Sequence, residues 1–274
     1  MRPGITLLRF LCFTFALATL QFLLLLFHIP LSRRLPMIWH RGVCGIFRFR
    51  IELHGRLSQR SPALFVCNHT SYLDISVLGA ILPGCFVAKA EVRSWPLFGF
   101  LATLQRTVFV ERKMARTGHH RDEMITRMEM GDNLILFPEG TSNDGNRVLP
   151  FKSAFFEAAS KKINGKSITV QPVSLAYTRL DGIPIGRRYR PYFAWYGDME
   201  LFSHLWSIAG IGKTTIVVQF HKPIIFDDFG DRKSLAHYCS ETISTGVSDA
   251  ISGRIRPIKK RHWWPTKRLY SGSE

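Results

Sequence analysis

The amino-acid sequence predicts an α/β fold, in which a mixed, largely parallel sheet is flanked by helices and preceded by a membrane-attached hydrophobic helix. Three observations lead to this prediction. Short apolar runs alternate with helical patterns through the middle of the chain, which is typical of an α/β fold. Hydrophobic residues form 46% of the 274 residues, enough to bury one sizeable core. A nearly uninterrupted apolar run lies near the N-terminus.

The apolar run covers residues 10–27 and contains one strongly polar residue, Gln21. Extended to Leu31 it has about 22 residues, or roughly 33 Å as a helix, which is long enough to cross the hydrocarbon core of a bilayer. The A-x-A triplet at residues 16–18 lies inside the run, which argues against a cleaved signal peptide. Arginines are denser after the run, so a spanning helix would leave the following residues in the cytoplasm. A helix lying in the membrane interface is the alternative.

These features divide the chain into an N-terminal membrane anchor (residues 1–34), a central domain (residues 35–250) and a basic-aromatic tail (residues 251–274). Residues 35–50 mix aromatic side chains with arginines, which suits lipid head groups. The tail combines many Lys and Arg with two tryptophans, which suits an anionic membrane surface. An ordinary surface helix and a solvated tail are the respective alternatives. We expect the protein at the inner (cytoplasmic) membrane of the cell, with the central domain facing the cytoplasm.

The pattern of the central domain predicts its elements in order. Predicted strands cover residues 63–67, 107–110, 134–137, 170–177, 193–196 and 215–220. Predicted helices cover residues 72–81, 119–130 and 151–162. Because strands and helices alternate, we expect a largely parallel or mixed sheet, with the site at the end of the sheet, where α/β proteins usually place it.

The charge balance points to an anionic partner. Lys and Arg total 37 against 20 Asp and Glu, which gives a net charge of +17. A surplus of this size favours nucleic acid, acidic lipid, or an anionic substrate or carrier. The five cysteines are scattered and form no C-x-x-C motif, which argues against a disulfide framework and favours a reducing compartment.

A His–Asp pair follows the first predicted strand of the domain. His69 and Asp74 are five positions apart, so on one continuous helix they would face about 140° apart. They can meet if His69 lies in the loop before the helix, with Ser71 as N-cap and Asp74 in the first turn, as in a capping box. An imidazole held by a carboxylate can take a proton from an alcohol that attacks an activated acyl group.

Three further motifs follow the strands. Phe137 to Thr141 read F-P-E-G-T directly after an apolar strand, which predicts a tight turn where Glu139 holds substrate hydroxyls or orients the site. Arg112 follows the strand at residues 107–110 and offers a planar fork for phosphate or carboxylate. Val170 to Val173 read V-Q-P-V and fit an edge strand.

Together these four motifs resemble the glycerolipid acyltransferase family, whose bacterial type member acylates 1-acyl-glycerol 3-phosphate. The N-H-x-S-x-x-D motif of that family matches Asn68, His69, Ser71 and Asp74. Its F-x-x-R, F-P-E-G-T and V-x-P-V motifs match Phe109 with Arg112, Phe137 through Thr141, and Val170 with Pro172 and Val173.

The resemblance implies a role for each matched residue. It makes His69 the general base and Asp74 its partner. It implies substrate-binding roles for Asn68, Ser71, Phe109, Arg112, Glu139, Gly140 and Thr141, with Arg147 as a further candidate from the following loop. It also implies an O-acyltransferase that needs no metal or cofactor, takes its acyl chain from acyl carrier protein or acyl-CoA, and accepts a lysolipid.

The acceptor stays open at this point. Many family members have an arginine after the F-P-E-G-T motif, whereas this chain has Ser142, and Arg147 could take its place. Residues 88–91, 144–147 and 194–198 look most like the branch of the family that acylates lyso-ornithine lipid. Lysophosphatidate and lyso-ornithine lipid are therefore both expected acceptors.

Two other interpretations are weaker. Cys67 beside His69 could be a thiol nucleophile, although a strand cysteine is more often part of the core. The positive charge would also permit a membrane-tethered nucleic-acid-binding protein. The sequence contains no helix-turn-helix, zinc-finger or RNA-binding signature, so we expect no nucleic-acid partner.

Overall fold

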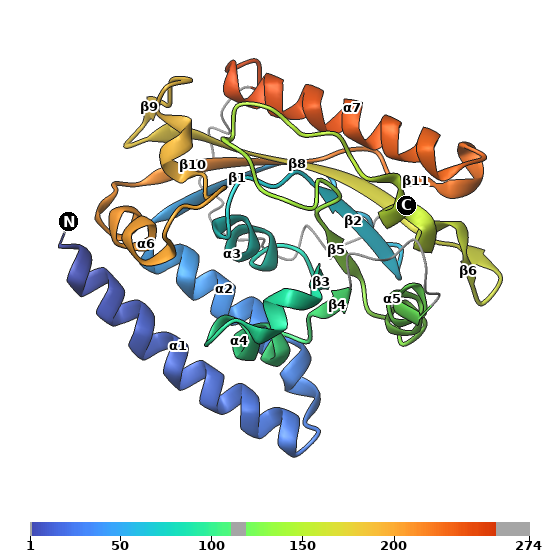
Figure 1. The fold of residues 1–274 in the computed structure, drawn as a ribbon, viewed down its shortest axis with the longest axis horizontal. Coiled ribbons are helices and arrows are strands. Elements are labelled where there is room, and N and C mark those ends of the chain that lie inside the picture. Colours follow the sequence, from blue (N-terminus) through green and yellow to red (C-terminus); the bar gives the residue numbers. More distant parts are fainter. Residues whose placement is uncertain (1, 111–118, 256–274) are drawn as a thin grey trace.

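The computed structural model describes residues 2–110 and 119–255. These residues form a nine-stranded sheet whose main path runs in the order β1–β10–β8–β2–β5–β3–β4 (Figure 1). In that order the strands are β1 (Phe49–Gly55), β10 (Thr214–Phe220), β8 (Thr169–Leu180), β2 (Ala63–Cys67), β5 (Leu134–Leu136), β3 (Cys85–Lys89) and β4 (Val108–Val110). Two short strands, β9 (Ile183–Pro184) and β11 (Ile224–Ile225), also pair with β8.

The direction of the strands confirms the predicted mixed, largely parallel sheet. From β8 through β2, β5 and β3 to β4, each strand is parallel to its neighbour. β10 runs antiparallel to β8, and β1 is parallel to β10. The carboxyl ends of β2 and β5 therefore meet at one edge, and β8 continues past them to Leu180.

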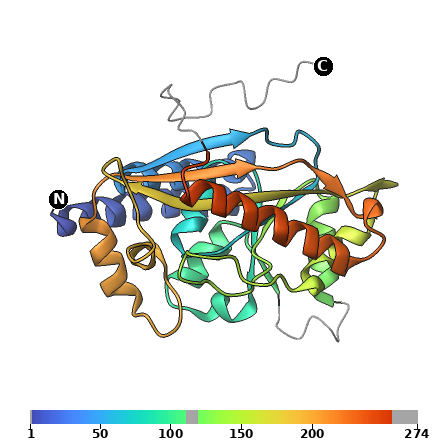
Figure 2. The same cartoon turned by 90° about the horizontal axis from the view of Figure 1, so that it is seen from above.

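Helices cover both faces of the sheet. They are α1 (Pro3–Leu26), α2 (Leu35–Ile46), α3 (Leu73–Gly79), α4 (Phe98–Leu104), α5 (His119–Glu129), α6 (Leu201–Gly210) and α7 (Arg232–Ile251). Figure 1 shows α7 on one side of the sheet, α2 and α3 on the other, and α1 outermost. Figure 2 shows α7 lying along β8, the strand it contacts most. Short 3₁₀ helices include η1 (Pro30–Arg33), η2 (Ala90–Ser94), η3 (Ser153–Ser160), η4 (Arg190–Phe193) and η5 (Phe226–Asp228).

The core has two halves that share the central strands. On the α2–α3 side, Phe65 and Cys67 of β2 pack with Val77 and Leu78 of α3. On the α7 side, the alternate β2 residues Leu64 and Val66 pack with residues of α7 such as Leu235 and Ile243. All five residues of β2 are buried, as expected for a strand covered on both faces. This central strand gives the loop that follows it a rigid base.

The N-terminal apolar run forms α1, which packs against the domain. Within the described residues it is the one helix long and apolar enough to cross a membrane, with a mean hydropathy of 1.9. Its buried stripe, spaced mostly by seven residues, is Thr6, Leu7, Thr14, Gln21 and Leu24. These residues face α2, α4 and α6, the helices that α1 contacts.

Gln21, the polar exception in the run, has a structural role. Its Nε2 donates to the backbone carbonyls of Ser32 and Leu104, each at 2.9 Å. These bonds fix the C-terminal half of α1 against η1 and α4. The amphipathic residues 35–50 form α2 and the start of β1, and α2 packs between α1 and α3. The basic-aromatic tail lies largely outside the described residues, so the predicted division into three segments stays a prediction.

Several predicted elements differ from the structure. The strand predicted at residues 193–196 is wrong, because residues 190–193 form η4 and an irregular segment follows. Its alternation arises because Phe193 is buried in the core while Trp195 lines the cavity at the site and Tyr196 is exposed. The helix predicted at residues 151–162 is the 3₁₀ helix η3. The structure adds β1, β3, α4, α6 and α7, which the sequence pattern did not reveal. The edge strand expected at residues 170–173 is wrong, because these residues belong to β8, which lies between β10 and β2.

Candidate active site

The candidate site lies where β2 and β5 end, beside the longer strand β8. His69 lies in the loop between β2 and α3, and Glu139 lies in the turn after β5. Asn68 joins this loop to β8, because its Nδ2 donates to the carbonyl of Leu175 (2.9 Å) and its Oδ1 accepts from the Leu175 N–H (2.8 Å). Both ends of the Asn68 amide are therefore used to hold the loop at the edge of the sheet.

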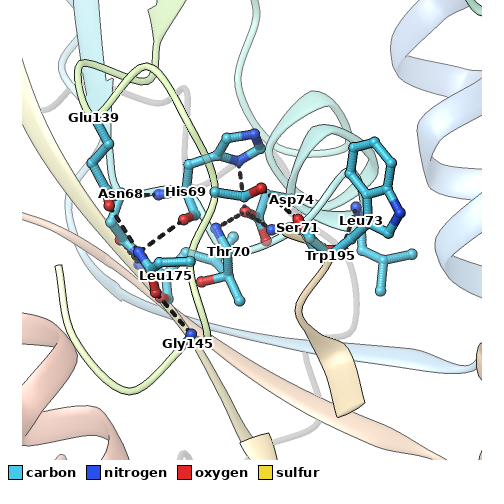
Figure 3. Close-up of polar contacts among 12 residues, drawn as sticks. Asn68, His69, Thr70, Ser71, Leu73, Asp74, Glu139, Gly145, Leu175 and Trp195 are labelled. Atoms are coloured by element: carbon cyan, nitrogen blue, oxygen red, sulfur yellow. Dashed lines mark hydrogen bonds and ion pairs between the residues drawn. The ribbon is translucent and has the colours of Figure 1, made fainter. Parts of the chain in front are cut away.

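His69 and Asp74 form a hydrogen-bonded pair. The His69 Nδ1 lies 3.0 Å from the Asp74 Oδ2 (Figure 3). The His69 side chain is 20% exposed, whereas that of Asp74 is fully buried. Since an ionised carboxylate only accepts hydrogen bonds, this geometry places a proton on Nδ1 and leaves Nε2 as the basic nitrogen.

Asp74 accepts three more hydrogen bonds. Its Oδ2 also accepts from the N–H groups of Thr70 (2.6 Å) and Ser71 (2.9 Å). Its Oδ1 accepts from the hydroxyl of Tyr177 on β8 (2.8 Å). Burial and the neighbouring Asp74 charge raise the pKa of Tyr177 well above its usual range, so this hydroxyl keeps its proton. A buried carboxylate needs donors of this kind to stay ionised.

The expected capping box is formed in one direction. Asp74 reaches back to the N–H of Ser71, as predicted. The helix begins at Leu73, however. The Ser71 hydroxyl accepts from the Leu73 N–H (3.4 Å), whereas a complete capping box would have it accept from the Asp74 N–H. Ser71 itself is fully buried, so its side chain supports the loop from inside.

Aromatic stacking fixes the plane of the imidazole. The rings of His69 and Phe137 are nearly parallel, with centroids 4.1 Å apart and an interplanar angle of 19°. Phe137 stacks in turn on Phe86 of β3, with centroids 6.1 Å apart. Because the Asp74 bond fixes one ring edge and Phe137 one ring face, the imidazole has little rotational freedom.

Glu139 holds the same loop from the other side. Its Oε1 accepts from the backbone N–H of His69 (2.7 Å), as Figure 3 shows. Its Oε2 accepts from the Asn143 amide (2.8 Å) and the Leu149 N–H (2.9 Å). Asn143 also donates to the carbonyl of His69 (3.2 Å). Glu139 is 2% exposed, so it orients the site through these contacts.

Burial raises the pKa of Glu139 to about 7, although hydrogen bonds from His69, Leu149 and Asn143 act in the opposite direction. The folded state therefore binds this proton more tightly than an unfolded chain, where the ordinary value is 4.5. Linkage then requires that the Glu139 contribution to stability is largest at low pH and is lost as the pH rises from about 4.5 to about 7.

An apolar cavity of about 580 Å³ extends from His69 towards the N-terminal helices. Its volume is within the roughly 300–1,000 Å³ typical of ligand pockets. One end is formed by His69, Gly140 and Thr141. The walls are formed by aliphatic and aromatic side chains of α1, α2, α3 and α4, among them Phe10, Leu17, Trp39, Val43, Ile75, Phe98 and Leu101. Such a cavity fits a hydrocarbon chain whose reactive end lies at the imidazole.

The structure brings some of the predicted residues to this cavity. Gly140 has φ +68°, and a Cβ there would lie 2.8 Å from the Lys152 Nζ, so the turn suits glycine. Thr141 is exposed and lines the cavity. Val110 lines the cavity as well. Because side chains alternate along a strand, the neighbouring Phe109 points away from the cavity. The Arg93 guanidinium lies 5.8 Å from the centroid of the Phe109 ring.

Two predicted arginines have different outcomes. Arg147 is exposed, in the loop that follows the F-P-E-G-T turn. Its charge is one of those that stabilise the ionised form of the neighbouring Asp144. Arg112 lies outside the described residues, so its substrate-binding role stays a prediction.

Sequence reasoning missed four residues of the site. Thr70 and Tyr177 donate to Asp74, Asn143 bridges His69 and Glu139, and the Trp195 N–H donates to the Thr70 carbonyl (3.1 Å). Tyr177 had a sequence signal, because it ends the predicted strand after the V-Q-P-V motif. The other contacts use backbone groups or loops, for which no spacing rule exists.

Cys67 belongs to the core. It is fully buried, and burial together with the Asp74 charge raises the pKa of its thiol well above the usual range. A thiol in this state is a poor nucleophile. Among the residues that the structure describes, no group of three or more His, Cys, Asp or Glu converges in the way that metal ligands do.

Known proteins are similar to this chain in sequence and in fold. The acyltransferase family matches residues 49–176, which contain all four motifs. A lyso-ornithine lipid O-acyltransferase of Brucella abortus is 44% identical over 88% of this chain and 92% of its own length. The chain belongs to this acyltransferase family.

Two further relatives are similar in sequence, and one solved structure is similar in fold. A lyso-ornithine lipid O-acyltransferase of Rhizobium meliloti is 39% identical over 89% of this chain and 85% of its own length. A 1-acyl-sn-glycerol-3-phosphate acyltransferase of Neisseria meningitidis is 32% identical over 76% of this chain and 79% of its own. The crystal structure of the 1-acyl-sn-glycerophosphate acyltransferase of Thermotoga maritima has the same fold, with a TM-score of 0.60 at 20% identity, covering 94% of this chain and 100% of that chain.

The Glu139 network of the acyltransferase can be tested with Glu139→Gln. The glutamine amide nitrogen cannot accept, so it must face a backbone or side-chain N–H, and we expect a loss of about 1–3 kcal/mol in the free energy of unfolding. The loss should be larger at pH 5 than at pH 8, because the wild type loses stability over this range and glutamine does not titrate. Denaturant unfolding at both pH values measures it, with the exposed Glu129→Gln as control. A variant as stable as the wild type at pH 5 would contradict this role.

Proposed function

We propose that this acyltransferase moves a fatty acyl chain from a thioester donor to the hydroxyl of lyso-ornithine lipid, as a step of membrane-lipid biosynthesis. The observation that carries the proposal is the His69–Asp74 pair at the end of the apolar cavity. The 44% identity to a protein named for this reaction supports the choice of acceptor.

In the proposed reaction His69 is the general base. Its Nε2 takes the proton of the lysolipid hydroxyl while the hydroxyl oxygen bonds to the carbonyl carbon of the thioester. The C–S bond then breaks, and the leaving thiolate takes the proton from the imidazolium. The products are the acylated lipid and a free thiol, and no covalent acyl-enzyme is needed, because the thioester is already activated.

Asp74 has two functions in this mechanism. Its charge stabilises the imidazolium that forms in the transition state, and its hydrogen bond keeps the proton on Nδ1 so that Nε2 is free to act. Neither function requires Asp74 to take up a proton. Glu139 and Asn143 act indirectly, because they hydrogen-bond to the backbone of His69 and hold it in position.

The catalytic pair is tested by two substitutions. His69→Ala should lower kcat about 10²- to 10⁴-fold, the usual contribution of a general base. Asp74→Asn should lower kcat by a similar amount, because the amide can keep the backbone contacts but carries no charge. Both variants should keep the wild-type melting temperature within a few degrees, which separates loss of chemistry from loss of fold. Turnover at the wild-type rate in His69→Ala would refute the mechanism, and the exposed His237→Ala is the control.

Two features support lyso-ornithine lipid over lysophosphatidate as acceptor. The two relatives named for lyso-ornithine lipid are 44% and 39% identical to this chain, against 32% for the Neisseria meningitidis relative named for 1-acyl-sn-glycerol 3-phosphate. Ser142 stands where many family members have an arginine. Its hydroxyl donates a hydrogen bond to the Trp195 carbonyl. This position therefore fixes a loop and offers no cation to a phosphate.

For the donor we propose acyl carrier protein. Its acidic surface would be attracted to a chain with a net charge of +17. Acyl-CoA phosphates would be attracted in the same way, so charge alone does not separate the two donors. Docking of a folded carrier, however, should depend on ionic strength more steeply than binding of a small thioester, because it involves more charge pairs.

Acceptor and donor are tested in one set of assays. Purified enzyme receives lyso-ornithine lipid or lysophosphatidate, each with acyl carrier protein or acyl-CoA as donor, and kcat/KM is measured at low and high salt. We expect about 100-fold preference for lyso-ornithine lipid, equal to roughly 2.7 kcal/mol, and a faster, salt-sensitive reaction with the carrier protein. The same preference for lysophosphatidate would overturn the acceptor, and faster salt-insensitive turnover of acyl-CoA would overturn the donor.

We propose that α1 lies in one leaflet of the inner membrane, with the central domain on the cytoplasmic side. The helix contacts α6 near its start, where Gly4 lies close to Trp206, and α4 near its end, where Gln21 donates to the Leu104 carbonyl, so both of its ends are held against the same domain. A helix crossing the bilayer would place these two contacts at opposite membrane surfaces. Its outward face is apolar and exposed, and includes Leu8, Phe15 and Phe22. Apolar residues of α4 and α6, the helices that α1 contacts, are exposed as well, among them Phe100 and Trp206.

The depth of α1 can be measured with spin labels. Leu8→Cys, Phe15→Cys and Phe22→Cys place labels on one stripe of the helix, in a Cys12→Ser background that removes the one exposed native thiol of the described residues. In liposomes of bacterial lipids the three labels should lie at similar depths within one leaflet. A label at position 15 near the bilayer centre, with positions 8 and 22 near opposite surfaces, would show a spanning helix instead.

A further inference from the structure

Two segments far apart in the sequence lie together beside the active-site loop. Ser142 donates to the carbonyl of Trp195, and the Trp195 N–H donates to the Thr70 carbonyl. Gly145 lies between them: a Cβ there would be 3.0 Å from the Thr70 Cγ2 and 3.9 Å from the Arg190 Cβ. Figure 3 shows Gly145 close to the loop that carries His69. Residues 142–147 and 187–195 therefore form one surface next to the catalytic pair.

This surface combines one carboxylate with several guanidinium groups. Asp144 accepts from the backbone and side-chain nitrogens of Asn146, both at 3.1 Å. Partial burial opposes ionisation of Asp144, but the Asn146 bonds and the charges of Arg147 and Arg187 outweigh it and lower the pKa of Asp144. Asp144 is thus anionic in the neutral range and lies among cations.

Arg190 is the half-buried cation of the group. Its Nη1 donates to the Asn146 Oδ1 (2.9 Å), so Asn146 links Arg190 to Asp144. Burial and the charge of Arg187 lower the pKa of Arg190, while the charge of Asp144 acts in the opposite direction. Its buried Nε has no acceptor among the residues that the structure describes. The Nε itself is inaccessible, but the side chain is partly exposed, and a planar guanidinium suits the two oxygens of a carboxylate.

We propose that Asp144 and Arg190 form the head-group subsite of the enzyme and read a zwitterionic amino-acid head group. Asp144 pairs with the terminal ammonium, and Arg190, with Arg187 nearby, takes the carboxylate. The inference rests on the proposed function, because it assumes that the acceptor is a lysolipid of the ornithine type. It names the residues that select this acceptor, which the family motifs do not contain.

The same carboxylate disfavours a phosphate monoester. A dianionic head group placed among Arg147, Arg187 and Arg190 would lie close to the Asp144 charge, and like charges held together at a binding site weaken binding. An ammonium at that position removes the conflict. Asp144 thereby contributes to selectivity in both directions, by attracting one acceptor and repelling the other.

The proposal is tested by pairing a change in the enzyme with a change in the lipid. Asp144→Asn keeps an oxygen that can accept from the Asn146 N–H but removes the charge, and the partner change is acetylation of the terminal amine of lyso-ornithine lipid. In the wild type, acetylation should lower kcat/KM about 10-fold, as expected for a partly exposed charge-assisted contact. In Asp144→Asn the native lipid should lose a similar factor, and acetylation should then have little further effect.

Three further measurements complete the test. Asp144→Asn should keep or improve kcat/KM for lysophosphatidate, and this activity also shows that the loop is folded. Arg190→Gln should lower kcat/KM for both acceptors. Glu241→Gln on α7 removes the same charge from an exposed position and should change nothing. Equal losses on both acceptors in Asp144→Asn, or the same effect of acetylation in variant and wild type, would overturn the subsite. A wild type that does not acylate lyso-ornithine lipid would instead overturn the proposed function.

Discussion

The site depends on the fully buried side chain of Asp74 and the four hydrogen bonds that its oxygens accept. Asp74 has no contact with solvent, and its four donors come from the loop before α3, from the imidazole and from β8. Removing a charge from water without such donors costs several kcal/mol, so the loop must adopt the shape that delivers them. The requirement explains why His69 lies where it does: the same Oδ2 that holds the N–H groups of Thr70 and Ser71 also holds the ring.

A second carboxylate completes this arrangement from the opposite side. Glu139 accepts from the N–H of His69, and Asp74 accepts from the N–H groups of the next two residues. Three consecutive backbone donors are thus satisfied by side chains and not by helix or sheet. The two carboxylates differ in surroundings. Among the described residues, Asp74 hydrogen-bonds to the imidazole, whereas the hydrogen-bond partners of Glu139 are backbone groups and the Asn143 amide. This difference is the basis for proposing that Asp74 acts in the reaction and that Glu139 holds the loop.

Much of the fold and the central pair could be predicted from the sequence, because both follow local rules. The apolar runs of β2, β5, β8 and β10 are short and bounded by turn residues, and the five-residue separation of His69 and Asp74 requires a loop before a helix. The rest depends on tertiary contacts that leave no local pattern. Residues 193–196 alternate like a strand, yet Phe193 fills the core and Trp195 bonds to the site loop. The roles of Asn143 and Tyr177 likewise arise from pairs of residues that are 74 and 103 positions apart.

The apolar cavity connects the N-terminal helix with the loop that carries His69. Part of the cavity wall is formed by Phe10 and Leu17 of α1, the same helix that carries the exposed apolar face. The His69 imidazole lines the same cavity. An acyl chain in this cavity would therefore contact α1 along its length while its carbonyl lies at His69. A helix that only tethered the domain would have no reason to bury Gln21 and bind it to two backbone carbonyls, as this one does. The N-terminal helix is accordingly part of the cavity wall, and under the proposed function binding of the acyl chain would depend on the docking of α1 against α2, α4 and α6.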